Sequence, residues 1–220
     1  GKGVLICKTF EEAKSGIEEL MIDKSFGDAG NTIVIEEFLQ GREVSVLSFV
    51  DGTHYALMTS AQDHKRAKDG DEGLNTGGMG TFSPSPFYTE EVDRYCKEHI
   101  YQKTVDAIFY GLMLTKSGVK VLEYNARFGD PETQVVLPRM ENDIIDVFEA
   151  CIDGCLDKID LKFEKNAAVC VVLASDGYPL KYEKGKKIKG LENFEGKTDI
   201  FAFHAGTKKV NGDVLTNGGR

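Results

Sequence analysis

The sequence predicts an α+β fold with several antiparallel hairpins, and three kinds of segment lead to this prediction. Apolar, strand-like segments recur along the chain, at 33–39, 44–50 and 167–174. Segments with the apolar spacing of a helix stand between them, at 9–21, 89–108 and 142–151. The Asp51-Gly52 pair is typical of a tight turn between antiparallel strands.

The composition is that of a soluble globular protein with a substantial core. Of the 220 residues, 41% are hydrophobic and 29% are charged. The formal net charge of −9 argues against nucleic-acid binding, because phosphate backbones require a clustered basic surface. No apolar run approaches the roughly 18 residues of a membrane span, and the start shows no signal-peptide pattern. We therefore expect no membrane partner and a cytoplasmic location.

The first 31 residues predict a strand followed by a helix. The segment 4–7 is apolar and strand-like. Thr9 and Glu12 then form a capping-box pattern, because the hydroxyl and the carboxylate can each accept a hydrogen bond from a free backbone N–H. The helix continues with an apolar stripe that includes Ile17 and Leu20.

Two strands separated by a glycine follow, at 33–39 and 44–50, and a hairpin continues to Met58. The strand end at 36–39 offers backbone donors and acceptors beside apolar walls, which an adenine ring needs, and Glu43 offers an acid for a ribose. An exposed hairpin that carries two acids is the competing explanation of these residues.

A polar motif, Gln62-Asp-His-Lys-Arg66, precedes a glycine-dense loop that ends in Asn75-Thr-Gly-Gly-Met-Gly80. This loop lacks the GKS/T ending of a Walker A motif, so that kind of phosphate cradle is excluded. Its glycines permit either a close backbone approach to a ligand or a flexible surface loop. Lys65 and Arg66 can stabilise charge on a transferred phosphate, although isolated lysines and arginines are more often surface charges.

An acid and an amide end the strand-like segment 119–125. Glu123 and Asn125 lie two residues apart, so on an extended strand both side chains point to one face. Two oxygen donors there can hold Mg²⁺, which normally takes one or two carboxylates and fills its shell with water and phosphate oxygens. An edge strand with a solvated polar face would explain the pair alone. The dense polar run that continues to Glu132 favours the metal site.

The last 80 residues predict one more helix and then a change of character. Asn142 is the expected N-cap of a helix with a packed apolar face. From about Leu161 the chain becomes β-rich, with a continuous apolar strand at 167–174, an alternating segment at 199–204 and a glycine turn at 217–219.

Three separated motifs carry a resemblance to a known family. The runs EYNARFGDPETQ at 123–134, QDHKR at 62–66 and NTGGMG at 75–80 stand in one order along the chain. Together they resemble the phosphoribosylamine–glycine ligases of purine biosynthesis, which are ATP-grasp enzymes. The resemblance implies an ATP-grasp domain of two α+β subdomains, at 1–60 and 61–160, followed by part of a β-rich C-terminal domain at 161–220. It also implies a preceding N-terminal domain in the native chain.

The family's activity would be ATP-dependent ligation of glycine to 5-phosphoribosylamine through a glycyl phosphate, with Mg²⁺ or Mn²⁺ held by Glu123 and Asn125. The resemblance assigns nucleotide binding to Lys2, Glu36, Glu37, Phe38, Leu39 and Glu43. It assigns catalytic roles to Lys65, Arg66 and Arg127. It assigns substrate binding to Asn75, Thr76, Gly77, Gly78, Asp130 and Glu132. For Asp130 and Glu132, bracing of the loop around Pro131 is an equal alternative to substrate contact.

Two other functions remain open from the sequence. The chain would be a nucleotide-binding fragment without catalysis if the parts of the family that it does not show are essential. It would be an ATP-grasp ligase with another acid and amine if the RFGDPE run does not set the substrate. The family also carries a glycine-containing loop and the start of a strand that this chain does not show. We expect that a segment is omitted from the sequence between about Ile108 and Phe109.

Overall fold

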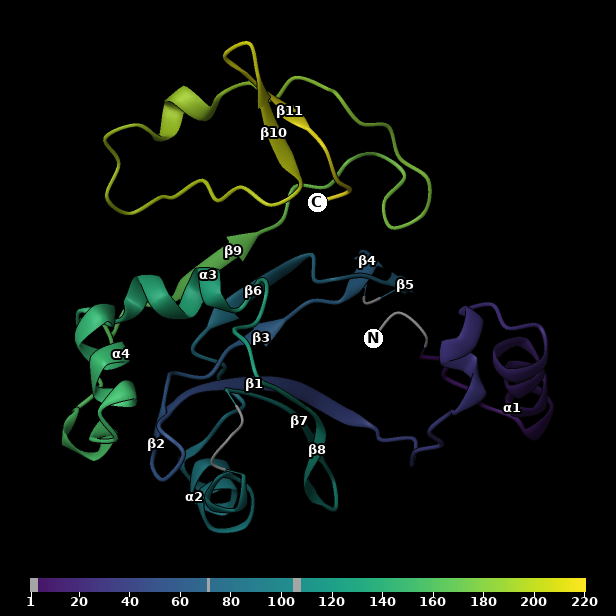
Figure 1. The fold of residues 1–220 in the computed structure, drawn as a ribbon, viewed down its shortest axis with the longest axis horizontal. Coiled ribbons are helices and arrows are strands. Elements are labelled where there is room, and N and C mark those ends of the chain that lie inside the picture. Colours follow the sequence, from purple (N-terminus) through teal and green to yellow (C-terminus); the bar gives the residue numbers. More distant parts are fainter. Residues whose placement is uncertain (1–3, 71, 105–107) are drawn as a thin grey trace. The chain divides into compact units, whose positions relative to one another are not determined.

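The computed structural model describes residues 4–70, 72–104 and 108–220 (Figure 1). The chain forms two compact units, which divide between Gln40 and Gly41. The subdomain boundary expected at residue 60 therefore lies 20 residues away from this division. The reason is that residues 41–50 form a long strand that pairs with the strand at 109–115, so both strands belong to the second unit.

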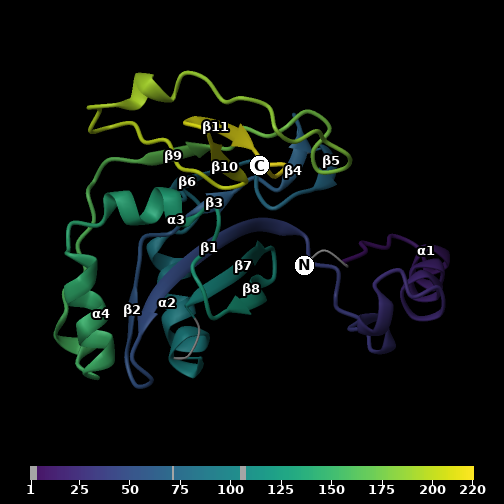
Figure 2. The same cartoon turned by 45° about the horizontal axis from the view of Figure 1, so that its top comes forward.

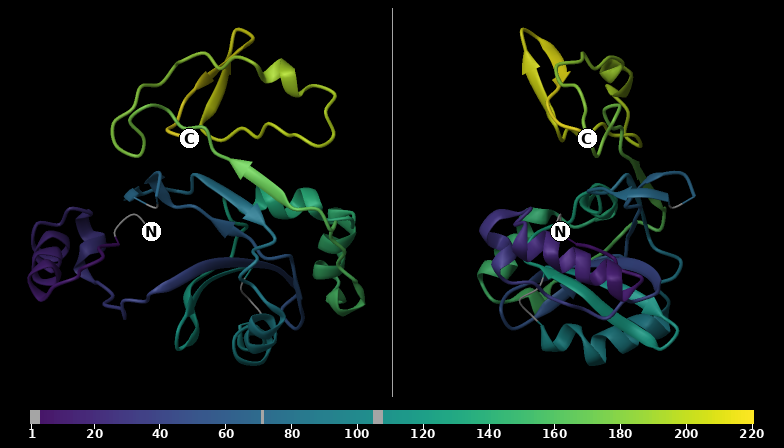
Figure 3. Two further views of the ribbon diagram at one scale, coloured as in Figure 1. Left: turned by 180° about the vertical axis from the view of Figure 1, so that it is seen from behind. Right: turned by 90° about the vertical axis from the view of Figure 1, so that its right-hand side faces the viewer.

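The regular structure of the first unit is helical among its described residues (purple in Figure 3). Helix α1 (Phe10–Ile17) begins at Thr9, whose hydroxyl accepts from the Glu12 N–H at 3.1 Å. The Glu12 carboxylate accepts from the Lys8 N–H, so the predicted capping pattern is present with its second bond shifted by one residue. A π-helical turn, η1 (Glu18–Ile22), and a 3₁₀ turn, η2 (Gly27–Asn31), follow.

The two strands predicted in the first unit are absent from its described residues. The segments 4–7 and 33–39 carry no strand assignment, and Val34 and Ile35 are about 80% exposed. An apolar segment becomes a strand by pairing its backbone with a neighbour, and no described segment of this unit pairs with either of them. The strand prediction was wrong here because sequence pattern does not supply the partner.

The second unit is built on a four-stranded antiparallel sheet. Its strands, in spatial order, are β2 (Tyr55–Leu57), β1 (Gly41–Val50), β7 (Phe109–Thr115) and β8 (Gly118–Asn125). The predicted hairpin turn at Asp51-Gly52 joins β1 to β2, and Asp51 accepts from the N–H groups of Thr53 and His54.

Helices cover both faces of this sheet (Figures 1 and 2). Helix α2 (Glu90–His99), capped by Thr89, packs Cys96 against one face, together with Ile100 and Tyr101. Helices α3 (Thr133–Val136) and α4 (Ile144–Ile152) pack against the other face. The first face contributes Val44, Val46, Tyr110 and Leu112 to the core, and the second contributes Leu47, Phe49 and Phe109.

Shorter strands complete the second unit. A three-stranded sheet has the order β3 (Gln62–Asp63), β6 (Gly80–Ser83), β9 (Ala168–Val171). One hairpin pairs β4 (Arg66–Lys68) with β5 (Glu72–Asn75). Another pairs β10 (Thr207–Val210) with β11 (Asp213–Thr216). The described residues of this unit also form the 3₁₀ turns η3 (Tyr101–Lys103), η4 (Leu137–Arg139), η5 (Leu156–Lys158) and η6 (Leu191–Phe194).

Some predicted boundaries need correction. The strand predicted at 167–174 is limited to β9, and 199–204 carry no strand. The helix from Thr89 ends at His99 rather than near 108, and the α4 cap is Asp143 rather than Asn142. The Asp143 carboxylate accepts from the Ile145 N–H at 2.8 Å.

The β-sheet continues without interruption at the expected break. Ile108 donates to the Asn125 carbonyl at 3.0 Å and accepts from the Ser48 N–H at 2.9 Å, and Phe109 begins β7 directly. Residues 105–107 lie outside the described part of the chain. Among the described residues, no helix has both the length and the apolar character to cross a membrane.

Candidate active site

A β-bulge in β8 turns Glu123 toward the face of the sheet that carries the polar site. In the pairing with β7, Leu112 is opposite Val121 while Gly111 is opposite Glu123, so Leu122 is an extra residue. Val121 therefore packs with the core beside α2, whereas Glu123 and Asn125 lie on the opposite face. The expectation that Glu123 and Asn125 share one face is met.

Glu43 and Ser45 on β1 lie on this same face, because Ser45 is opposite Gly111 and Glu43 is two residues away. The Ser45 hydroxyl donates to Glu132 Oε1 at 3.0 Å, across 87 positions of sequence. Glu132 is 4% exposed, so its carboxylate is buried against the sheet rather than open to solvent. The structure thus brings the loop after β8 back onto β1.

Two glycines leave the space that these acids fill. A Cβ at Gly111 would lie 3.0 Å from Glu123 Cγ and 3.5 Å from the Phe109 ring. A Cβ at Gly129 would lie 2.5 Å from Glu132 Oε2 and 2.9 Å from the same ring. Larger residues at either position would displace an acid of the site.

Lys65 lies among carboxylates. Its Nζ is 2.5 Å from Glu43 Oε2 and 4.0 Å from Asp63 Oδ1. Burial acts to lower the pKa of Lys65, but the charges of Asp63 and Glu43 outweigh it and raise that pKa, with a further contribution from Glu123. The lysine is therefore held in its charged form at the centre of the site.

Asp63 was not among the predicted site residues, although it belongs to the QDHKR motif. Its side chain is 6% exposed. Burial raises the pKa of Asp63 to about 6, against the lowering effect of Lys65 and with further raising by Glu132. The available sequence signal was an acid two residues from a predicted catalytic lysine within the same polar motif.

The two motifs at 62–66 and 75–80 are joined by backbone hydrogen bonds. The Lys65 carbonyl accepts from the Thr76 N–H and from the Thr76 hydroxyl, both at 2.7 Å. The Gly78 N–H donates to the same hydroxyl at 3.0 Å, and Arg66 is opposite Asn75 in the β4–β5 hairpin. Arg66 also donates to the Gly73 carbonyl at 2.8 Å. The glycine-dense loop therefore fixes the backbone that carries Lys65.

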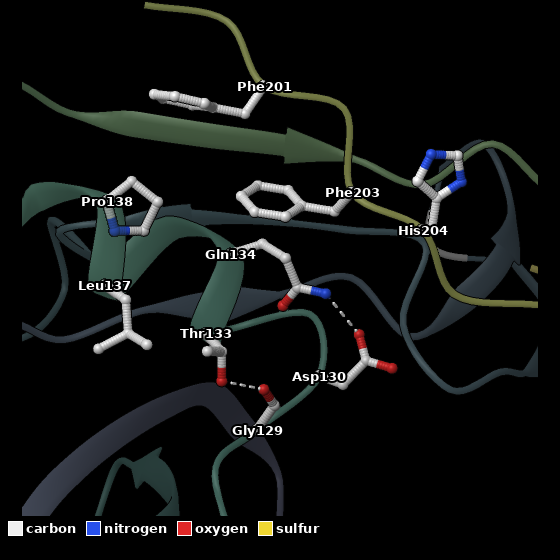
Figure 4. Close-up of a pocket in the computed structure, with 9 residues that line it drawn as sticks. All are labelled: Gly129, Asp130, Thr133, Gln134, Leu137, Pro138, Phe201, Phe203 and His204. Carbon is white, nitrogen blue, oxygen red and sulfur yellow. Dashed lines mark hydrogen bonds between the residues drawn. The ribbon is translucent and has the colours of Figure 1, made fainter. Parts of the chain in front are cut away.

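The loop after β8 contains Arg127 and Asp130. Arg127 is exposed, lies over the Phe109 ring at 5.8 Å and donates to the Phe128 carbonyl at 3.0 Å. Asp130 accepts from Gln134 Nε2 at 2.9 Å (Figure 4) and from Arg220 at 2.9 Å. A cavity of about 610 Å³ adjoins this loop, and Figure 4 shows aromatic side chains along one of its walls. Its lining includes Asp130, Gln134, Phe201, Phe203 and His204.

The donor set around Glu123 fits a small divalent cation. Among the described residues no cluster of three or more His, Cys, Asp or Glu side chains is placed to hold a metal. Mg²⁺ does not need one, since one or two protein ligands suffice beside phosphate and water. The Asn125 side-chain nitrogen is buried without a hydrogen-bond partner in the described structure. Because amide nitrogen and oxygen are interchangeable by a flip, this orphaned end suits an oxygen directed at a cation.

The other predicted nucleotide-binding residues lie outside the second unit or outside the described residues. Glu36, Glu37, Phe38 and Leu39 belong to the first unit, where 33–40 have no regular structure. Lys2 lies outside the described residues. The adenine-binding role of 36–39 and the phosphate-binding role of Lys2 stay predictions.

Two family models match the chain. The model described as "Phosphoribosylglycinamide synthetase, ATP-grasp (A) domain" matches residues 1–133, and the "Phosphoribosylglycinamide synthetase, C domain" model matches 168–220. The subdomain and C-terminal boundaries at 60 and 160 stay predictions, because these matches do not end there.

Relatives of the chain are similar along its whole length. It is 48% identical over 232 residues to the trifunctional purine biosynthetic protein adenosine-3 of Gallus gallus, covering 100% of this chain and 23% of that protein. It is 45% identical over 232 residues to the phosphoribosylamine–glycine ligase of Vibrio parahaemolyticus, covering 100% of this chain and 54% of that protein. The chain thus spans about half the length of such ligases. The alignments are longer than its 220 residues, so the relatives contain positions without a counterpart here, and a gap after Ile108 stays a prediction.

Solved structures support the fold. The crystal structure of phosphoribosylamine–glycine ligase from Thermotoga maritima matches with a TM-score of 0.83 at 34% identity, covering 100% of this chain and 56% of that chain. Biotin carboxylase from Campylobacter jejuni matches with a TM-score of 0.58 at 18% identity, covering 81% of this chain and 40% of that chain, and shows the fold alone. The predicted α+β, ATP-grasp fold class is confirmed. The chain belongs to the phosphoribosylglycinamide synthetase family, of which it carries the ATP-grasp domain and C-domain sequence.

Proposed function

We propose that this chain is the ATP-grasp part of a phosphoribosylamine–glycine ligase. The reaction joins glycine to 5-phosphoribosylamine and yields glycinamide ribonucleotide, ADP and phosphate. Family membership and the names of the relatives support this substrate pair. The observation that carries the proposal is the polar face where Glu123 and Asn125 on β8 meet Glu43 and Lys65, because such a face suits a metal–triphosphate complex.

The proposed reaction has two steps. A glycine carboxylate oxygen attacks the γ-phosphorus of ATP, the bond to the β–γ bridging oxygen breaks, and ADP leaves with the electron pair. The amine nitrogen of 5-phosphoribosylamine then attacks the acyl carbon of glycyl phosphate. The bond from that carbon to the phosphate oxygen breaks, phosphate leaves, and the nitrogen loses a proton.

The residues of the chain serve this chemistry through charge and position. Lys65, held in its charged form by neighbouring acids, faces the negative charge of the transferred phosphoryl group. Glu43 holds Lys65 and is available to the ribose hydroxyls. Glu123 and Asn125 would hold Mg²⁺ or Mn²⁺, which supplies charge neutralisation and alignment of the phosphates. Arg127, on the exposed loop, would contact phosphate or the glycine carboxylate.

The test is product formation by the longest polypeptide that carries this chain. ATP-dependent phosphate release should require both glycine and 5-phosphoribosylamine, with glycinamide ribonucleotide identified by mass spectrometry. Replacing glycine with alanine or serine controls for another acid. Phosphate release that proceeds equally with those acids, or without the amine, would replace this proposal with a different ligase.

One observation favours a second candidate, a nucleotide-binding fragment without turnover. The chain spans 54% of a ligase of this family, so catalysis can require parts that this sequence does not contain. Titration calorimetry, which measures binding of ATP in the presence of Mg²⁺, decides between the two candidates when it is combined with the phosphate-release assay. Saturable, metal-dependent ATP binding with no phosphate release at any substrate concentration would establish the fragment function. We propose a cytoplasmic location for either.

A further inference from the structure

Glycines interlock the two motifs that end the chain, HAGT at 204–207 and TNGGR at 216–220. The Gly206 N–H donates to the Arg220 carbonyl at 2.8 Å, and the Gly206 carbonyl accepts from the N–H groups of Asn217 and Gly218. A Cβ on Gly206 would lie 2.7 Å from the Gly218 Cα. A Cβ on Gly219 would lie 2.2 Å from the Tyr178 ring. This packing allows no larger side chain, so the backbone that carries Arg220 is fixed.

The Arg220 side chain is directed from this platform to the loop after β8. Its NH2 group is 2.9 Å from Asp130 Oδ2, and the Arg220 side chain is 16% exposed. The other oxygen of the same carboxylate, Oδ1, accepts from Gln134 Nε2 at 2.9 Å (Figure 4). Asp130 is therefore held at both oxygens, once by the C-terminal segment and once by α3. A carboxylate oxygen has a second lone pair, so each still accepts a bond from a ligand.

Arg220 also contacts the glycine-dense loop at Gly77. A Cβ on Gly77 would lie 2.6 Å from Arg220 NH2 and 2.8 Å from its Nε, so the guanidinium rests on the Gly77 backbone. The Gly77 N–H donates to the Tyr178 hydroxyl at 3.1 Å. One guanidinium thus contacts both loops that carry predicted substrate-binding residues, 75–78 and 127–132, which are about 50 positions apart in sequence.

We propose that Arg220 is a positioning residue for the second step, in which it holds Asp130 and the loop at Gly77 in place to receive 5-phosphoribosylamine. This inference rests on the proposed function. The Asp130 carboxylate accepts from the amine nucleophile, and Arg220 fixes the orientation of that carboxylate. The acids and the lysine that face the nucleotide, including Glu43 and Lys65, pair with one another and not with Arg220. Arg220 is therefore not part of the Glu43–Lys65 pair that is assigned to ATP, and the proposal assigns it to the acceptor amine.

Hydroxylamine separates the two steps, because this small amine traps glycyl phosphate as a hydroxamate without needing a site for a sugar phosphate. The experiment uses the longest polypeptide that carries this chain. It measures hydroxamate from ATP, glycine and hydroxylamine, and glycinamide ribonucleotide from ATP, glycine and 5-phosphoribosylamine. The variants are Arg220→Gln, Arg220→Lys and Asp130→Asn, and the control is Lys209→Gln, an exposed lysine on β10.

For Arg220→Gln we expect the KM for 5-phosphoribosylamine to rise about tenfold or more. Hydroxamate formation and the KM for ATP should stay within about twofold of wild type. Arg220→Lys should recover part of the loss, and Asp130→Asn should reproduce it. Lys209→Gln should match wild type in both reactions. If Arg220→Gln fails to fold, Arg220→Lys decides by the same two reactions, because it keeps the positive charge and removes the guanidinium that contacts both Asp130 and Gly77.

Three results would overturn the inference while the proposed function stands. One is an unchanged KM for 5-phosphoribosylamine in Arg220→Gln and Asp130→Asn. The second is an equal loss of hydroxamate and glycinamide ribonucleotide in a folded variant, and the third is the same loss in Lys209→Gln. A wild-type protein that forms neither product would instead overturn the proposed function, and the role of Arg220 in it.

Discussion

Replacing Gly111 with alanine tests whether the space above this glycine is what allows Glu123 to reach its place on the sheet. The new methyl group would lie 3.0 Å from Glu123 Cγ, whereas ordinary contacts lie at 3.4–4 Å. The Glu123 side chain must therefore shift by a few tenths of an ångström to restore ordinary contact. Misplacement by about 1 Å can cost a reaction on the order of 100-fold, so we expect about a tenfold loss of kcat/KM and a higher metal requirement.

Stability should change little in the same variant. An alanine in a strand is favoured over glycine by roughly 0.5–1 kcal/mol, whereas overpacking costs roughly 1–3 kcal/mol. The Tm should therefore fall by only a few degrees. Phosphate release measured against increasing Mg²⁺ at saturating substrates gives the metal requirement, and calorimetry gives the Tm.

Gly80→Ala is the matched control for this experiment. Its Cβ would also meet an atom at 3.0 Å, the Cys170 carbonyl oxygen, but no acid of the site. It should therefore also lose stability but keep its metal dependence. The reasoning is refuted if Gly111→Ala has the wild-type metal requirement, or if both variants change that requirement equally.

Three further changes have separate readouts. Glu123→Ala should abolish metal-dependent turnover and leave the circular dichroism spectrum unchanged; full activity would remove the metal assignment. Arg139→Met should lower the free energy of unfolding, measured in urea, by about 3–5 kcal/mol. The reason is that this buried guanidinium donates to Thr59, Ser83 and two backbone carbonyls. Arg139→Lys should lower the free energy of unfolding by less. The bond to Asp51 raises the pKa of His54, so His54 adds stability below pH 6.5, and this gain disappears as pH rises through the raised pKa. The Tm difference between wild type and His54→Gln should accordingly be largest near pH 5 and smallest near pH 9, and a difference independent of pH would contradict it.

Local signals in the sequence predicted the local structure well. The cap at Thr9, the helix start near Thr89 and the turn at Asp51-Gly52 form as expected, and the cap expected at Asn142 is displaced by one residue to Asp143, because each depends on residues within four positions. The strand at 33–39 was predicted from an equally clear pattern and does not form. A cap is complete within its own segment, whereas a strand is complete only when another segment pairs with it.

The site depended on contacts that spacing does not reveal. The Ser45–Glu132 hydrogen bond spans 87 positions, and the Arg220–Asp130 ion pair spans 90. Ser45 and Gly111 do not belong to any sequence motif that would have indicated a function. The polar motifs could be recognised individually, but their convergence follows from the antiparallel order of β1, β7 and β8, which only the structure supplies.

The bulge at Leu122 shows how a correct prediction can follow from an incomplete rule. Strict alternation places Glu123 and Asn125 on one face, but it also places Val119 and Val121 with them. A regular strand would then bury the Glu123 carboxylate in the apolar core beside α2 or expose both valines. Burying an unpaired carboxylate costs several kcal/mol, whereas one disturbed ladder hydrogen bond costs about 1 kcal/mol. The bulge is the less costly solution, and it lets one strand supply the core with its first half and the site with its second.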